Sequence, residues 1–215
     1  GCEWAVRVEH VDFGLLLGPG RVKMAARNKG TVLVLDELID EVVEEARRIV
    51  EEKNPELASK DQIAEQVGIG AIVFNDLKRE RVKDVIFDKT EILAFEGETG
   101  PYVQYTHARL SSILRKAPRE NVAPDWARLE DSASILLALG RFPAVVASAA
   151  EKCEPSEVAQ YLLALCRTIS SWLGEHRVLD EDPTLRATRL LLVRGAVVVL
   201  KNGLTLLGVA APEEM

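Results

Sequence analysis

A short basic loop is the first part of this 215-residue sequence whose residue types could do chemistry. It runs Lys23-Met-Ala-Ala-Arg-Asn-Lys-Gly30 and puts three cations within seven residues. Small neighbours and a closing glycine would let these cations approach a polyphosphate without ordering much side-chain bulk. A solvated loop that binds nothing explains the same charges, because charge runs usually face water. The loop lacks the G-x-x-x-x-G-K-[ST] pattern of a Walker nucleotide site.

A second candidate is the segment 101–119, which contains no acid. It interleaves rings with cations: Tyr102, Tyr105, His107, Arg109, Arg115, Lys116 and Arg119. Rings that stack on bases and cations that meet phosphates are typical of nucleic-acid binding. Alternatively, the two tyrosines pack between two parts of the fold. The residues alone do not separate these two interpretations.

A third candidate is the acid-free stretch 183–212, on a predicted helix. Its cations are Arg186, Arg189, Arg194 and Lys201. A basic helix of this kind suits phosphate contact. An ordinary helix with one solvated face would have the same composition.

Other kinds of site find no support in the residue pattern. The three histidines and three cysteines have no metal-ligand spacing, so we expect no metal site and reduced thiols. No G-x-S-x-G nucleophile motif is present. No uninterrupted apolar run reaches the ~18 residues of a membrane span, which predicts a cytoplasmic protein without a membrane partner.

The composition predicts a globular protein whose acidity is local. The chain is 47% hydrophobic and 28% charged, with a net charge of −7. Residues 36–65 hold eleven acids and four bases, so their net charge of −7 equals the net charge of the whole chain. The rest of the chain is neutral on average, so the basic segments remain compatible with an RNA partner.

The pattern of apolar residues predicts the elements that carry these candidates. Residues 11–34 and 82–87 have the composition of strands and turns, and Gly68 and Gly70 indicate a close packing contact inside a helix. Ser59 and Gln62 suggest a capping box, and Ser156 an N-cap. Apolar periodicity predicts helices over 35–53, 59–77, 102–116, 125–139, 144–152, 156–175 and 184–207. The predicted fold class is therefore mainly α, with a small α/β part over 1–117 and an all-α bundle over 118–215.

One long string resembles a known family. Phe95-Glu-Gly-Glu-Thr-Gly-Pro-Tyr-Val-Gln-Tyr-Thr-His-Ala-Arg109, continuing as Ser112-Ile-Leu-Arg-Lys116, closely resembles arginyl-tRNA synthetases. The similarity covers essentially the whole chain. It extends to the segments 9–14, 68–74, 76–81, 200–209 and 211–215, the last of which ends on Met215.

The resemblance implies a division of labour along the chain. Residues 1–34 would end a class I Rossmann catalytic domain, with a KMSKS-type loop formed by Lys23, Met24, Arg27 and Lys29. Residues 35–117 would be a helical junction, and 118–215 a DALR-type anticodon-binding domain. The implied reaction is ligation of arginine to tRNA(Arg), with ATP and Mg²⁺ in the intact enzyme, by a cytoplasmic monomer. The tRNA-binding residues would be Tyr102, Gln104, Tyr105, His107, Arg109, Arg115, Lys116, Trp172, Arg186, Arg189, Lys201 and Met215.

The sequence also departs from that family in three places. There is no HIGH motif, and the chain begins with Gly1 rather than Met, so we expect upstream sequence to be missing. We therefore expect no arginyl adenylate from this chain alone, and arginine and ATP as partners only with the missing catalytic half. The KMSKS-type loop has Ala25, and the usual aromatic anticodon pattern is replaced by Ile169-Ser-Ser-Trp-Leu173, with Val197 in place of a common arginine. Two alternatives stay open: a free-standing, catalytically inactive tRNA-binding module, and a helical interaction scaffold.

Overall fold

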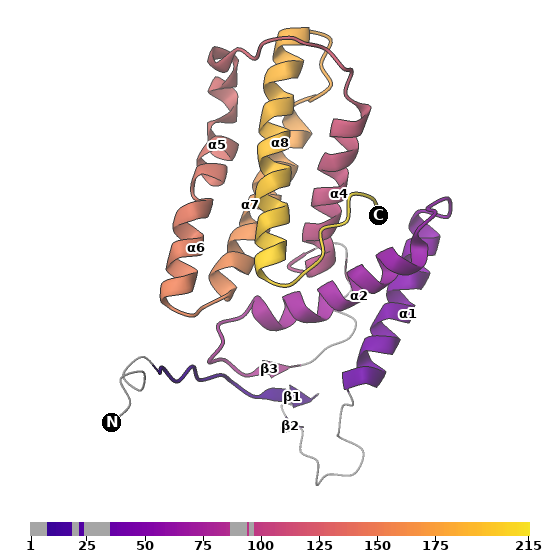
Figure 1. The fold of residues 1–215 in the computed structure, drawn as a ribbon, viewed down its shortest axis with the longest axis vertical. Helices are drawn as coiled ribbons and strands as arrows, with labels where there is room; N and C mark the ends of the chain where they lie inside the picture. The colour runs from indigo at the N-terminus through magenta and orange to yellow at the C-terminus, as the bar shows by residue number, and fades with distance from the viewer. Residues whose placement is uncertain (1–7, 19–21, 24–34, 87–93, 95–96) are drawn as a thin grey trace.

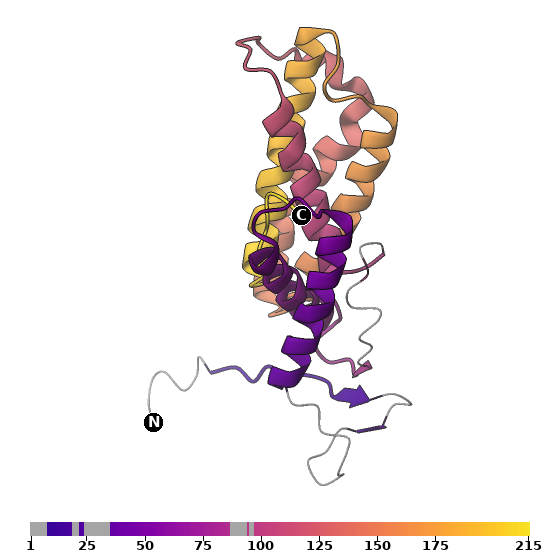
Figure 2. The same ribbon diagram turned by 90° about the vertical axis from the view of Figure 1, so that its right-hand side faces the viewer.

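A computed structural model describes residues 8–18, 22–23, 35–86, 94 and 97–215. A bundle of roughly parallel and antiparallel helices stands above a crossed pair of helices and a small sheet (Figures 1 and 2). The elements are β1 (Leu16–Gly18), β2 (Val22–Lys23), α1 (Leu35–Lys53), α2 (Lys60–Leu77), β3 (Val85–Ile86), α4 (Gly100–Lys116), the 3₁₀ helix η3 (Trp126–Ser132), α5 (Ala133–Gly140), α6 (Phe142–Glu151), α7 (Ser156–Glu175) and α8 (Pro183–Leu206).

The sheet has β1 at its centre. β1 pairs antiparallel with β2, where Leu17 lies opposite Lys23, and parallel with β3, where Leu17 lies opposite Ile86. Just before β1, a Cβ on Gly14 would lie 2.3 Å from the carbonyl oxygen of Lys83, so only glycine fits there. The predicted strand over 82–87 is shorter than expected, with two residues in the ladder.

The pair α1–α2 has the predicted bounds, because its apolar periodicity is strong. Leu38, Val42, Ala46 and Val50 bury one face of α1 against α2. A Cβ on Gly68 would lie 2.9 Å from the Cα atom of Val43, which confirms the predicted close packing. The predicted capping box is wrong: Ser59 sits at φ −108° and ψ 39°, outside the extended geometry that a capping side chain needs, and it makes no side-chain cap hydrogen bond.

The bundle is formed by α4, α5, α6, α7 and α8 around one apolar core. Val103 and Leu110 of α4 pack in this core with side chains of α7 and α8 such as Leu162 and Leu200. The predicted helix 125–139 is in fact η3 followed by α5. A 3₁₀ turn places residues i and i+3 on one side, and here that spacing buries both Leu129 and Ser132.

The long helices α7 and α8 begin differently from one another. α7 has the predicted bounds, but Ser156 is its first helical residue rather than its N-cap, and its hydroxyl donates to Glu154 at 2.7 Å. α8 is capped by Asp182, whose carboxylate accepts from the backbone N–H of Thr184 at 2.9 Å and of Leu185 at 3.2 Å. Local capping chemistry therefore fixes the entry of α8 but not that of α7.

One stretch of the described chain, Ala133–Glu151, is long and apolar enough to cross a membrane by length and composition alone. In the structure this stretch is two helices, α5 and α6, which are separated at Arg141. Ile135 and Ala149 pack into the bundle core. A single stretch of this kind is weak evidence for a membrane span.

The C-terminal tail, residues 208–215, leaves α8 through Gly208 at φ +72°. It runs back past α4 and ends beside the α1–α2 pair (Figures 1 and 2). It thereby connects the bundle to the crossed helices below it.

Candidate functional site

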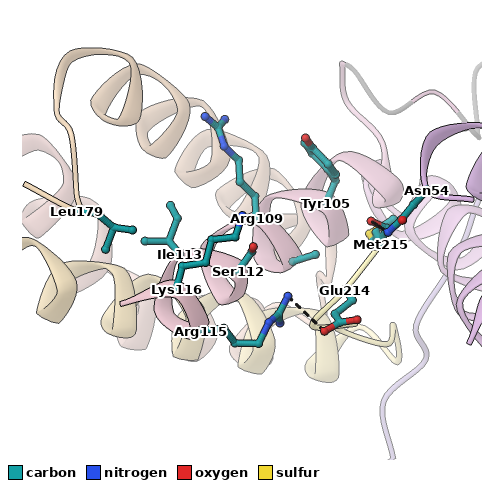
Figure 3. A pocket seen from close by; sticks show the side chains of 11 residues that line it. Asn54, Tyr105, Arg109, Ser112, Ile113, Arg115, Lys116, Leu179, Glu214 and Met215 are labelled. Carbon is teal, nitrogen blue, oxygen red and sulfur yellow. Dashed lines mark hydrogen bonds and ion pairs between the residues drawn. The ribbon is translucent and has the colours of Figure 1, made fainter. Parts of the chain in front are cut away.

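A groove on the outer face of α4 collects several of the predicted functional residues. It is a pocket of about 450 Å³ (Figure 3). We call it the α4 groove. It is lined by Asn54, Tyr105, Ala108, Arg109, Ser112, Ile113, Arg115, Lys116, Leu179, Glu214 and Met215. Its walls come from α4, the segment after α1, the segment before α8 and the C-terminal tail.

Helical phase brings the α4 residues together. Tyr105, Arg109, Ser112 and Lys116 follow one another at intervals of four, three and four residues, which is one face of an α-helix. The helix that carries them is fixed at its start, where the Thr99 hydroxyl accepts from the backbone N–H of Tyr102 at 3.3 Å. At its end, the helix dipole favours the cations of the last turn.

The charge of the groove is mainly positive. Arg115 is engaged, since it donates to the carbonyl oxygen of Glu213 at 2.8 Å and pairs with Glu214 at 3.4 Å. Arg109 and Lys116 are exposed, and neither has an acidic partner among the described residues. Tyr105 is 45% exposed at the other end of the groove. Arg109 lies one helical turn from the ring, and Lys116 lies about two turns further along the same face. This row suits a strand of nucleic acid that follows α4, with a base stacked on the ring and phosphates paired with the cations.

The opposite face of α4 carries predicted residues with a different environment. Gln104 and His107 are both fully buried. The Gln104 amide donates to the carbonyl oxygens of Gln66 at 3.1 Å and Ala210 at 2.9 Å. His107 donates from Nδ1 to the carbonyl oxygen of Pro212 at 2.8 Å, and burial lowers the pKa of its imidazole. These two side chains hold the tail from inside the protein.

Two further predicted residues also lie at packing positions. The ring of Tyr102 packs against the bundle core and its hydroxyl lies 3.3 Å from that of Ser170 on α7. Trp172 is buried, and its indole N–H donates to the hydroxyl of Ser132 at 2.9 Å. The sequence left open whether the two tyrosines pack inside the fold or are available to stack on a base. In the structure Tyr102 packs against the bundle core and Tyr105 faces the groove.

The predicted cations of α8 also divide into two that bind other parts of the protein and one that is exposed. Arg186 pairs with Glu120 and donates to the carbonyl oxygen of Asp180. Arg189 donates to the carbonyl oxygen of Arg177 at 3.0 Å, and its side chain is 10% exposed. Both arginines therefore fix the segment before α8, whereas Lys201 is exposed.

Of the four residues predicted for the catalytic loop, the structure describes one, Lys23. Lys23 ends β2, and Met24, Arg27 and Lys29 lie outside the described residues. Within the part of the chain that the structure describes, no three His, Cys, Asp or Glu residues gather as metal ligands. Cys153 and Cys166 are free thiols, and burial raises the pKa of Cys166 to about 12.

Sequence reasoning missed Asn54, Ser112 and Leu179 as groove residues. Ser112 could have been found, because it lies seven residues after Tyr105 on the same helical face. Asn54 and Leu179 carry no local signal, since they reach the groove through tertiary packing of distant segments.

Comparison with known proteins finds two family descriptions that match this chain. Residues 103–215 match "DALR anticodon binding domain", and residues 2–89 match "tRNA synthetases class I (R), catalytic domain".

Among curated relatives, arginine–tRNA ligase 1 of Bacillus thuringiensis subsp. konkukian is 46% identical over 216 residues. The arginine–tRNA ligase of Lactobacillus johnsonii is 46% identical over 217 residues. In both cases the match covers 100% of this chain and 38% of the relative, so the chain spans well under half the length of these proteins.

Two solved structures are similar in fold. Thermus thermophilus arginyl-tRNA synthetase superposes with a TM-score of 0.87 at 40% identity, over 94% of this chain and 35% of that one. Plasmodium falciparum arginyl-tRNA synthetase superposes with a TM-score of 0.77 over 96% of this chain and 35% of that one. At 24% identity, the latter supports the fold alone.

Proposed function

Because the chain belongs to the arginyl-tRNA synthetase family and contains its DALR anticodon-binding domain, we propose that it binds tRNA(Arg) through the α4 groove. In the intact enzyme this binding serves the ATP-dependent ligation of arginine to that tRNA. The chain acts in the cytoplasm as a monomer.

The observation that supports this function is the pairing of Tyr105 with two uncommitted cations in one groove. An unpaired base stacks on the Tyr105 ring, and phosphates pair with Arg109 and Lys116. Arg115, Lys201 and Met215 complete the RNA-facing set. The buried members of the predicted set act from within, by holding the groove in shape: Tyr102, Gln104, His107, Trp172, Arg186 and Arg189.

The catalytic contribution is assigned to the other end of the chain. In this proposal residues 1–117 comprise the end of the catalytic domain and the helical junction, whose last helix is α4. Residues 118–215 form the anticodon-binding domain, which packs against α4 in the bundle. The loop of Lys23, Met24, Arg27 and Lys29 assists ATP, with its Mg²⁺, once the remaining catalytic half is present. Because this loop is one part of a nucleotide site, no catalytic step is assigned to this chain by itself.

The test of RNA binding is a filter-binding titration of the chain at 50 and 200 mM salt. We expect tighter binding to tRNA(Arg) than to a tRNA of another identity. For the two phosphate contacts of Arg109 and Lys116, the affinity should fall roughly sevenfold between the two salt concentrations. Equal affinity for both tRNAs, or no binding to either, would refute the proposed function.

The catalytic part is tested by arginine-dependent pyrophosphate exchange in the presence of tRNA(Arg). We expect no exchange from this chain alone. Exchange above the level of a preparation in which Lys23→Ala has been introduced would contradict the assignment of catalysis to the missing half.

A further inference from the structure

Three main-chain oxygens of the C-terminal tail accept hydrogen bonds from side chains of α4. Gln104 donates to Ala210, His107 to Pro212 and Arg115 to Glu213, at 2.9, 2.8 and 2.8 Å. All three donors lie on α4, and Arg115 also pairs with the Glu214 carboxylate at 3.4 Å, so this helix holds the tail as far as residue 214. The last residue, Met215, lies beyond their reach.

Met215 is held by the α1–α2 pair and the residue that follows α1. The Asn54 amide donates to the main-chain oxygen of Met215 at 3.3 Å, and the two residues lie side by side at one end of the groove (Figure 3). The Met215 side chain packs against the apolar cluster of the α1–α2 pair. Among the described residues, only Asn54 hydrogen-bonds Met215.

The backbone around Asn54 is itself fixed. Its N–H donates to the carbonyl oxygen of Val50 at 2.9 Å, and its carbonyl oxygen accepts from Leu57 at 3.2 Å. Pro55 follows directly and restricts the backbone further. The amide of Asn54 therefore projects from a rigid corner at the end of α1 towards the groove.

We propose that Asn54 is a positioning residue for RNA binding: it anchors Met215 at the end of the α4 groove, where the thioether completes the surface that a base meets. This inference rests on the proposed function, because it explains how the tRNA-binding groove keeps its shape. Asn54 acts through Met215 and the α1–α2 pair. The groove is therefore formed jointly by the bundle and by the α1–α2 pair. RNA in the groove contacts both the bundle and the end of the α1–α2 pair.

The first test is the affinity of Asn54→Ala for tRNA(Arg). We expect binding two- to tenfold weaker than that of the unchanged chain, the ratio that one net hydrogen bond supplies. The dependence of affinity on salt should stay the same, because no phosphate contact is lost. The matched control is Asn121→Ala, on the exposed loop between α4 and η3, which should bind as the unchanged chain does.

A double-mutant cycle separates positioning from a general loss of structure. If Asn54 acts by placing the Met215 side chain, then Asn54→Ala should have no further effect in a Met215→Ala background. Equal losses in both backgrounds would overturn the inference. A reduced salt dependence in Asn54→Ala would also overturn it, since that would mark a lost phosphate contact.

A measurement without RNA keeps this inference distinct from the proposed function. The chain has two methionines, so labelling with [¹³C-methyl]methionine yields two methyl signals, and Met215→Ala identifies one of them. In Asn54→Ala the Met215 signal should narrow and move towards its random-coil shift. An unchanged signal would refute the anchor even if tRNA binds. A changed signal with no tRNA binding in any variant would retain the anchor and refute its role in RNA binding.

Discussion

The two faces of α4 differ in environment although they are built from the same string of residues. One face carries Tyr105, Arg109 and Lys116 and lines an open groove. The other carries Gln104 and His107, which are fully buried and hold the C-terminal tail. Both sets are polar, and neighbouring residues such as Gln104 and Tyr105 belong to different sets. Polarity therefore does not distinguish the groove-facing residues of this helix from the buried ones, whereas helical phase does.

The largest expected effect comes from breaking the buried face. Gln104→Ala removes donors to two carbonyl oxygens and leaves a cavity, so we expect the free energy of unfolding to fall by about 3 kcal/mol. Urea denaturation measures it. The control is Gln62→Ala on the exposed side of α2, which should change stability by less than ~0.5 kcal/mol. A loss as small as that of the control would mean that the two faces do not differ in this way.

Breaking the exposed face should affect binding and leave the fold intact. Arg109→Gln removes an uncommitted cation, so we expect the affinity for tRNA(Arg) to fall about tenfold, or ~1.4 kcal/mol, with a weaker dependence on salt. The unfolding free energy should not change. Arg141→Gln, at the junction of α5 and α6, is a matched exposed control that should not alter binding. If Arg109→Gln lowered both the unfolding free energy and the affinity, the two faces would not differ in the way described.

The buried face should also make stability depend on pH. Burial lowers the pKa of His107 in the folded chain below the ~6.5 of an unfolded histidine. The unfolded state therefore binds more protons, and the stability present above pH 6.5 is lost as the pH falls towards the folded pKa. We expect urea midpoints to drop between pH 7.5 and pH 5.5. His107→Gln keeps a donor for Pro212 and removes the titration, so its midpoints should drop less; an equal drop would assign the effect to other groups.

The smallest effect is expected from adding charge to the groove. Ser112→Lys places a third uncommitted cation on the exposed face, so binding to tRNA(Arg) should become about threefold tighter at low salt. Ser134→Lys on the exposed side of α5 is the control and should not tighten binding. Weaker binding by Ser112→Lys would show that the groove is too narrow for the added side chain.

The sequence predicts the family, the fold class and most of the helices. Family and fold class are confirmed by the family matches and by the Thermus thermophilus structure. The helix bounds 35–53 and 156–175 agree with the structure because strong amphipathic periodicity depends on local residues alone. The capping box predicted at Ser59 is wrong because Ser59, although at the N-cap position of α2, makes no side-chain cap hydrogen bond. The N-cap predicted at Ser156 is wrong because Pro155 occupies that position, and residue type alone does not determine the backbone conformation of a cap.

The site was harder to predict than the fold. The string at residues 95–116 contains the helix that lines the groove, and the helical period of α4 separates Gln104 from Tyr105. The hydrogen bond from Asn54 to Met215 joins residues 161 apart, and no local pattern encodes it. The division of the chain at residues 117 and 118 and the roles of the individual site residues stay predictions.

The long sequence separation of the tail contacts has a consequence for synthesis on the ribosome. Gln104 and His107 are made before their partners Ala210 and Pro212, which lie 106 and 105 residues further on. Until those last residues emerge, α4 has two polar side chains that cannot be buried without loss of hydrogen bonds. The inner face of α4 is therefore completed only after residue 212 has been made, and a chain that stops before Ala210 leaves Gln104 and His107 without these acceptors.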